Sequence, residues 1–111
     1  MKSYTDIEQS KRLAEILPFE SADMCYIKRE INNTFIETPI VKPIGGVEKS
    51  LCCWSLAALL DVLPKSLIYT PNQALDGYCC KNIMHDLETY GENPIDACVE
   101  MILKLNEENL L

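Results

Sequence analysis

The sequence predicts an α+β fold: three helices packed with a small antiparallel β-sheet built from two hairpins, in the order α-ββ-α-ββ-α. Three observations lead to this prediction. Apolar residues recur at helical spacing near both ends of the chain, and strand-like segments flank Asn32-Asn33. The stretch at 51–63 is apolar at almost every position. Because 111 residues have room for one hydrophobic core, residues 1–111 are predicted to form a single domain.

The first helix is predicted at about 6–17. Thr5 and Glu8 have the spacing of a capping box, and Pro18 stops the run. A β-hairpin is predicted at about 24–41, because both asparagines of the Asn32-Asn33 pair tolerate the positive φ of a tight turn. Pro39 has no N–H for a ladder, so the second strand of this hairpin should be an edge strand or end there.

After a loop at 42–50, the second helix is predicted at about 51–62, with Ser50 as N-cap and Pro64 ending it. The third helix is predicted at about 94–107, with Asn93 as N-cap and Pro94 at the first helical position.

The segment at 65–92 allows two interpretations. Five apolar or aromatic residues recur there at helical spacing before Gly91, a possible helix C′ residue, and they favour a helix: Cys80, Ile83, Met84, Leu87 and Tyr90. In contrast, "LIYT" is strand-like and Asp76-Gly77 is a turn signal, which favours strands.

Charge and cysteine content bound the classes of function. The net charge is −7, and residues 86–111 carry seven acidic residues against Lys104 alone. Nucleic-acid binding needs clustered Lys and Arg, so no nucleic-acid partner is predicted. The acidic C-terminal region indicates either a protein partner or a solvated surface.

No membrane association is predicted, because the apolar run at 51–63 is too short to span a bilayer. The N-terminus has charges where a secretory signal needs an apolar stretch, so a cytoplasmic location is predicted. In that compartment the six cysteines should be free thiols, which pack like small apolar residues.

The second and third helices are apolar on most sides. On the third, the polar side chains form a single row at four-residue spacing: Asp96, Glu100 and Lys104. Such helices need more covering than a hairpin and one amphipathic helix supply, so a homodimer is predicted. The candidate interface residues are Trp54, Leu56, Leu60, Val99, Ile102 and Leu103. The competing interpretation is that residues 65–92 cover these helices within one chain.

No catalytic site and no cofactor are predicted. Cys79, Cys80 and His85 are weak candidates for a metal site, because zinc ligands usually come from cysteines two to four residues apart and no C-x-x-C occurs. Lys49-Ser50 resembles the end of a phosphate-binding loop, but Glu48 replaces the glycine that such a loop requires. The sequence therefore predicts a small, cytoplasmic, non-enzymatic interaction protein. The alternative is a small-molecule or metal-binding module that uses the Cys79, Cys80 and His85 region.

Three blocks resemble the recurrent segments of a family of short, uncharacterised proteins of gut anaerobic bacteria, often associated with phage or conjugative DNA. The blocks are "TDIEQSKRLAEILPFESADM", "CWSLAALLDVLPK" and "NPIDACVEMILKLNEENLL". The resemblance implies no activity. It implies a strand-rich segment before the third helix, and so favours strands at 67–70, 78–83 and 87–90.

Overall fold

A computed structural model describes residues 2–41, 51–70 and 77–111. It confirms the α+β class, with three α-helices, one 3₁₀ turn and six strands in these ranges. The N-terminal elements are α1 (Ile7–Ala14), η1 (Phe19–Ser21), β1 (Met24–Ile31), β2 (Thr34–Val41) and β3 (Leu51–Cys53). The C-terminal elements are α2 (Leu56–Val62), β4 (Ser66–Tyr69), β5 (Tyr78–Asn82), β6 (Leu87–Gly91) and α3 (Pro94–Glu107).

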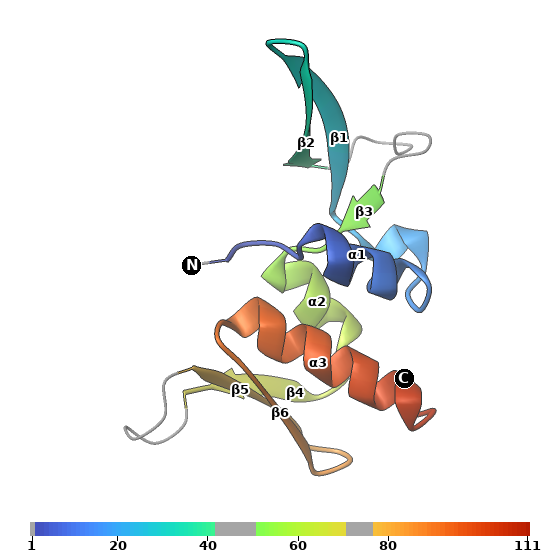
Figure 1. The fold of residues 1–111 in the computed structure, drawn as a ribbon. Helices are drawn as coiled ribbons and strands as arrows, with labels where there is room; N and C mark the ends of the chain where they lie inside the picture. Colours follow the sequence, from blue (N-terminus) through green and yellow to red (C-terminus); the bar gives the residue numbers. More distant parts are fainter. Residues whose placement is uncertain (1, 42–50, 71–76) are drawn as a thin grey trace.

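The strands form two antiparallel sheets of three strands each, in the orders β2-β1-β3 and β4-β5-β6. The sequence predicted a single sheet, whereas the two hairpins lie in separate sheets. Figure 1 shows the three helices between them, with the β1–β2 hairpin on one side and β4–β6 on the other. The helices are therefore covered from two directions within one chain.

Helix α1 is shorter than predicted and has a different cap. Its capping box joins Asp6 and Gln9, not Thr5 and Glu8, and its last helical residue is Ala14. Thr5 is fully buried, and its hydroxyl accepts from the backbone N–H of Trp54 at 3.0 Å. Because that hydroxyl serves the core, the neighbouring aspartate caps the helix.

The β1–β2 hairpin is confirmed at 24–41. Asn32 and Asn33 both have positive φ, 51° and 63°, as the two-residue turn requires. Pro39 lies opposite Tyr26 on β2, which is an edge strand of its sheet as predicted. The hairpin projects from the body as an arm (Figure 1), and the radius of gyration is 15.0 Å, above the roughly 13 Å of a compact chain of this length.

The predicted second helix starts too early. Leu51–Cys53 is strand β3, and α2 begins at Leu56 with Ser55 as N-cap, accepting from the N–H of Ala58. Asp23 fixes this cap, because its carboxylate accepts from both the N–H and the hydroxyl of Ser55. An apolar run without polar alternation does not distinguish a buried strand from a buried helix, which explains the error. The predicted N-cap Ser50 lies outside the described residues.

Residues 66–91 contain strands β4, β5 and β6, so the helical interpretation of this segment is wrong and the strand interpretation is confirmed. Asp86 has φ 52° in the turn between β5 and β6. Helix α3 has the predicted bounds and the predicted N-cap, with Asn93 accepting from the N–H of Asp96.

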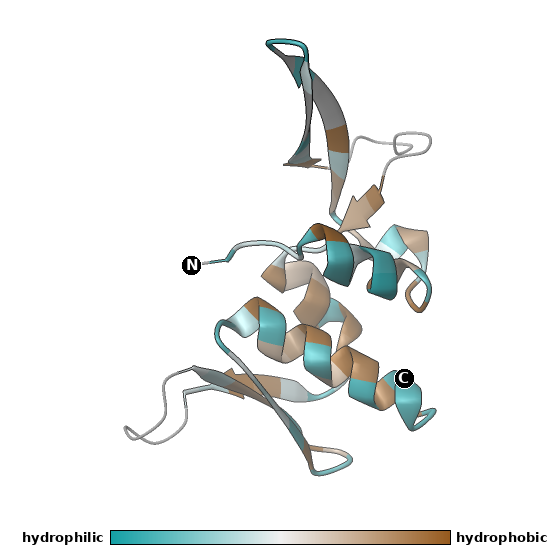
Figure 2. Ribbon diagram, viewed as in Figure 1, coloured by the Kyte–Doolittle hydropathy of each residue, from teal (hydrophilic) through white to brown (hydrophobic). Residues whose placement is uncertain are grey.

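The core lies where α1, α2 and α3 meet the second sheet, and Cys52 and Trp54 also belong to it. Figure 2 shows apolar residues, in brown, along α2 and alternating with polar ones along α3. All six cysteines are buried and none forms a disulfide, as predicted. No helix in the described ranges has the length and apolar character needed to cross a membrane.

Candidate functional site

The candidate site is a groove beside helix α3, next to a close backbone contact between β6 and α3. A Cβ at Gly91, the last residue of β6, would lie 2.4 Å from the backbone nitrogen of Ala97. Thr89 on the same strand donates its hydroxyl to the carbonyl of Ala97 at 2.8 Å. Strand β6 and the first turn of α3 are therefore held together without intervening side chains.

The groove is about 530 Å³ in volume and lies between α1, β6 and α3. Apolar surface comes from Tyr90, which is 47% exposed, and from Leu103. Arg12 of α1 and residues along α3 add five charged side chains to its lining: Arg12, Glu100, Lys104, Glu107 and Glu108. We call this feature the α3–β6 groove.

The charged side chains of the α3–β6 groove are free to meet a ligand. In the parts of the chain that the structure describes, none of the five takes part in an ion pair. Three of them are glutamates from the acidic C-terminal region identified in the sequence. A groove with unpaired charges of both signs and a half-exposed tyrosine can bind a peptide segment by charge-assisted hydrogen bonds and aromatic contact.

The candidate interface residues are mostly internal. Trp54, Val99 and Ile102 are at most 1% exposed and belong to the core of a single chain, so their assignment to a dimer interface is corrected. Leu56 and Leu103 are partly buried against the same core, and only Leu60 among the six counts as exposed, at 39%. The packing of β4, β5 and β6 against α3 supplies the covering that the sequence argument assigned to a second copy.

The structure does not assemble Cys79, Cys80 and His85 into a chelating group. Cys79 and Cys80 are neighbours on β5 and point to opposite faces, where Cys80 contacts Cys98 of α3. His85 lies in the turn after β5, where its backbone N–H donates to the side-chain oxygen of Asn82. Within residues 2–41, 51–70 and 77–111, no group of three or more His, Cys, Asp or Glu side chains has the arrangement of a metal site.

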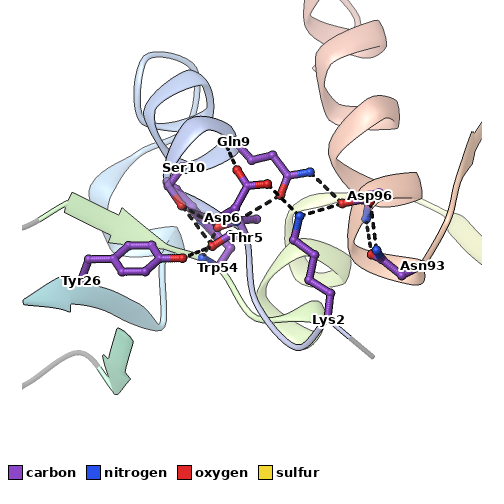
Figure 3. Close-up of polar contacts among 9 residues, drawn as sticks. All are labelled: Lys2, Thr5, Asp6, Gln9, Ser10, Tyr26, Trp54, Asn93 and Asp96. Atoms are coloured by element: carbon purple, nitrogen blue, oxygen red, sulfur yellow. Dashed lines mark hydrogen bonds and ion pairs between the residues drawn. The ribbon is translucent and has the colours of Figure 1, made fainter. Parts of the chain in front are cut away.

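A second polar constellation joins the N-terminus to α3 (Figure 3). The Lys2 ammonium contacts Asp6 and Asp96, at 2.9 Å each, and Gln9 donates to the same Asp96 oxygen at 2.8 Å. Beneath it, Tyr26 donates to the Thr5 carbonyl at 2.7 Å. We call the Lys2, Asp6, Gln9 and Asp96 contacts the N-terminal clasp. Each member already has protein partners, so the clasp is structural. The sequence analysis missed it because Asp96 is remote in sequence from Lys2, Asp6 and Gln9.

The N-terminal clasp makes stability depend on pH. Partial burial raises the pKa of Asp96, but hydrogen bonds from Lys2 and Gln9 and the Lys2 charge outweigh this and hold it below its ordinary value of 3.8. A carboxyl with a lowered pKa stabilises the fold above the unfolded-state value and loses this contribution as the pH falls through the folded-state value. We expect the urea midpoint of Asp96→Asn to lie below wild type at about pH 6, with the difference shrinking below about pH 3. A difference that persists unchanged in acid would contradict the ion-pair assignment.

Comparison with known protein families, curated proteins and solved structures gives no match for this chain. The resemblance of the three sequence blocks to proteins of gut anaerobes therefore stays a prediction, and the functional argument rests on the geometry of the groove.

Proposed function

We propose that this chain is a small, non-enzymatic, cytoplasmic interaction protein that binds a basic segment of a partner protein in the α3–β6 groove. The observation that carries the proposal is the convergence of unpaired Glu100, Glu107 and Glu108 on one groove with the exposed ring of Tyr90. Charge separation along the chain adds to it. With seven acidic residues against one lysine, the region 86–111 attracts a basic partner at long range.

Arg12 and Lys104 give the groove selectivity. They lie among the glutamates, so a segment of uninterrupted lysines meets repulsion, while a basic segment with one or two acidic residues pairs with both signs. Tyr90 and Leu103 then offer apolar surface to an aliphatic or aromatic side chain of the bound segment. The partner segment is therefore net basic, mixed in charge, and carries at least one apolar side chain.

A titration with a defined peptide tests this proposal. The probe is a soluble twelve-residue peptide of Lys, Glu and Leu with net positive charge, compared with its charge-inverted counterpart. In ¹⁵N NMR spectra we expect the amide shifts of Thr89, Tyr90 and Leu103 to move with the basic peptide only. Shifts spread evenly over the surface would indicate non-specific attraction and contradict the proposal.

Two variants with the same change in net charge separate the groove from general electrostatics. Glu100→Gln/Glu107→Gln/Glu108→Gln removes the groove carboxylates, and we expect it to weaken peptide binding about tenfold, as three exposed charge pairs permit. The matched control is Glu20→Gln/Glu30→Gln/Glu37→Gln, whose side chains are exposed and outside the groove. Equal losses in both triple variants would remove the groove from the explanation.

The predicted homodimer stays a separate proposal. Because Trp54, Val99 and Ile102 are internal, a second copy would have to contact exposed surface, to which the candidate set contributes Leu60. Light scattering during size exclusion at low micromolar concentration measures the mass. A monomer mass across the peak would end the proposal without affecting the groove.

A further inference from the structure

Two cysteines face each other at the base of the hairpin arm. Cys25 of β1 lies directly opposite Cys52 of β3 in the first sheet, so both side chains point to the same face. Both are buried, at 2% and 8% exposed, and Cys52 is the more exposed of the two. The backbone hydrogen-bond pattern between the two strands decides whether two opposed thiols are close enough to form a disulfide.

The turn of the hairpin fixes that pattern. A two-residue turn at Asn32-Asn33 makes Ile31 and Thr34 a hydrogen-bonded pair, and alternation along the unbroken register makes Cys25 and Ile40 another. The backbone N–H and C=O of Cys25 therefore point toward β2. In the pairing of β1 with β3, Cys25 and Cys52 are therefore a non-hydrogen-bonded pair. In such a pair the Cα atoms lie about 4.5 Å apart, and the side chains are closer than in a hydrogen-bonded pair. This separation is within the range of roughly 4.4–6.8 Å that a disulfide spans.

The other cysteines are worse placed for this chemistry. Cys53 lies opposite Met24 instead of a thiol, and burial raises the pKa of Cys53 to about 12, so it stays protonated. Cys79 lies between Tyr69 and Tyr90 on its sheet. Cys80 and Cys98 contact each other, but both are completely buried between β5 and α3, beyond the reach of a dissolved oxidant.

We propose that Cys25 and Cys52 form an oxidisable dithiol, which hydrogen peroxide converts into a cross-strand disulfide. The more exposed Cys52 reacts first: its thiolate sulfur attacks one peroxide oxygen, the O–O bond breaks, and a sulfenic acid and water result. The Cys25 sulfur then attacks the Cys52 sulfur, and the S–O bond breaks to release a second water. The two thiols lose two protons and two electrons, and the peroxide is reduced to two waters.

The disulfide would tie the base of the hairpin arm to β3. That strand leads directly into Trp54 and the Ser55 cap of α2, so the bond would couple the arm to the core. Because it closes the long chain segment between Cys25 and Cys52, we expect oxidation to raise the melting temperature by about 5–10 °C.

Mass spectrometry of the full chain tests the proposal. The native protein is treated with a few equivalents of hydrogen peroxide, alkylated under denaturing conditions, and compared with an untreated sample. We expect six alkylated cysteines before treatment and four after it, with a loss of about 2 Da before alkylation. Trypsin can cleave at Lys28 and Lys49, so the disulfide should join a peptide containing Cys25 to one containing Cys52.

Variants assign the bond. Cys53→Ser should still lose two thiols on oxidation, whereas Cys25→Ser and Cys52→Ser should not form an intramolecular disulfide. If a serine variant fails to fold, Cys25→Ala and Cys52→Ala replace it. The tryptic peptide that contains Cys52 also contains Cys53, so fragmentation of the cross-linked wild-type peptide must show which of the two is bonded. A disulfide between Cys80 and Cys98, or peroxide treatment that leaves all six thiols or gives only sulfinic acids, would overturn the proposal.

Discussion

Replacing Trp54 with alanine should lower the free energy of unfolding by about 3–5 kcal/mol, the range for removing a buried tryptophan. The side chain is 1% exposed and lies in the core with Leu13, Leu59 and Ile102. Its indole N–H donates to the Ser21 hydroxyl at 3.0 Å, so the substitution also removes a hydrogen bond. A loss of this size is a large share of the 5–15 kcal/mol that stabilises an ordinary domain. Urea unfolding followed by circular dichroism measures it.

Two further variants show which part of the tryptophan matters. Trp54→Phe keeps an aromatic ring and loses the N–H donor, so it should cost less than the alanine variant. Leu60→Ala, on the exposed side of α2, should cost under about 1 kcal/mol.

The same experiment separates a core residue from an interface anchor. A core tryptophan gives an unfolding midpoint that does not depend on protein concentration, whereas a dimer anchor gives a midpoint that rises with it. A Trp54→Ala protein that stays folded as a monomer, with wild-type stability at high dilution, would contradict the core assignment and support an interface role for Trp54.

Elements with local stop and start signals were predictable from the sequence. Helix α3 has both Asn93 and Pro94 at its start, and the β1–β2 hairpin has two asparagines suited to positive φ, so both were found with their observed bounds. The second helix was misplaced because Ser50 and Ser55 are both possible caps, and the choice depends on Asp23, which lies far away in sequence. Local patterns carry no information about such long-range partners.

The candidate site was predictable only in part. The acidic character of residues 86–111 pointed to the region, and three of its glutamates line the α3–β6 groove. Arg12 of α1 and Tyr90 of β6 line the same groove. Their proximity depends on how α1 and β6 pack beside α3, which local sequence patterns do not show. The interface candidates failed for a related reason: apolarity marks Val99 and Ile102 as needing cover, but does not say which part of the chain supplies it.

Replacing Gly91 with alanine should lower the free energy of unfolding by about 2–3 kcal/mol, toward the upper end of the cost of overpacking. The added methyl group would lie 2.4 Å from the nitrogen of Ala97 and 2.8 Å from the carbonyl carbon of Asp96. These are backbone atoms in the first turn of α3, so no side-chain rotation relieves the overlap and the helix must move from β6. The sequence analysis considered Gly91 as a helix C′ residue, whereas the structure requires a glycine there because two backbones meet.

Moving α3 away from β6 should also damage the candidate site. The hydrogen bond from Thr89 to the Ala97 carbonyl spans the same contact. Tyr90 follows Thr89 directly in β6 and lines the groove. We therefore expect Gly91→Ala to weaken binding of the basic peptide and to speed amide exchange in β6 and the first turn of α3. Glu92→Ala is the matched control, since Glu92 is the exposed neighbour of Gly91 and its substitution should change stability by no more than about 0.5 kcal/mol. A Gly91→Ala protein with wild-type stability and wild-type peptide affinity would mean that β6 and α3 do not pack backbone to backbone, and that this contact does not hold the walls of the groove in place.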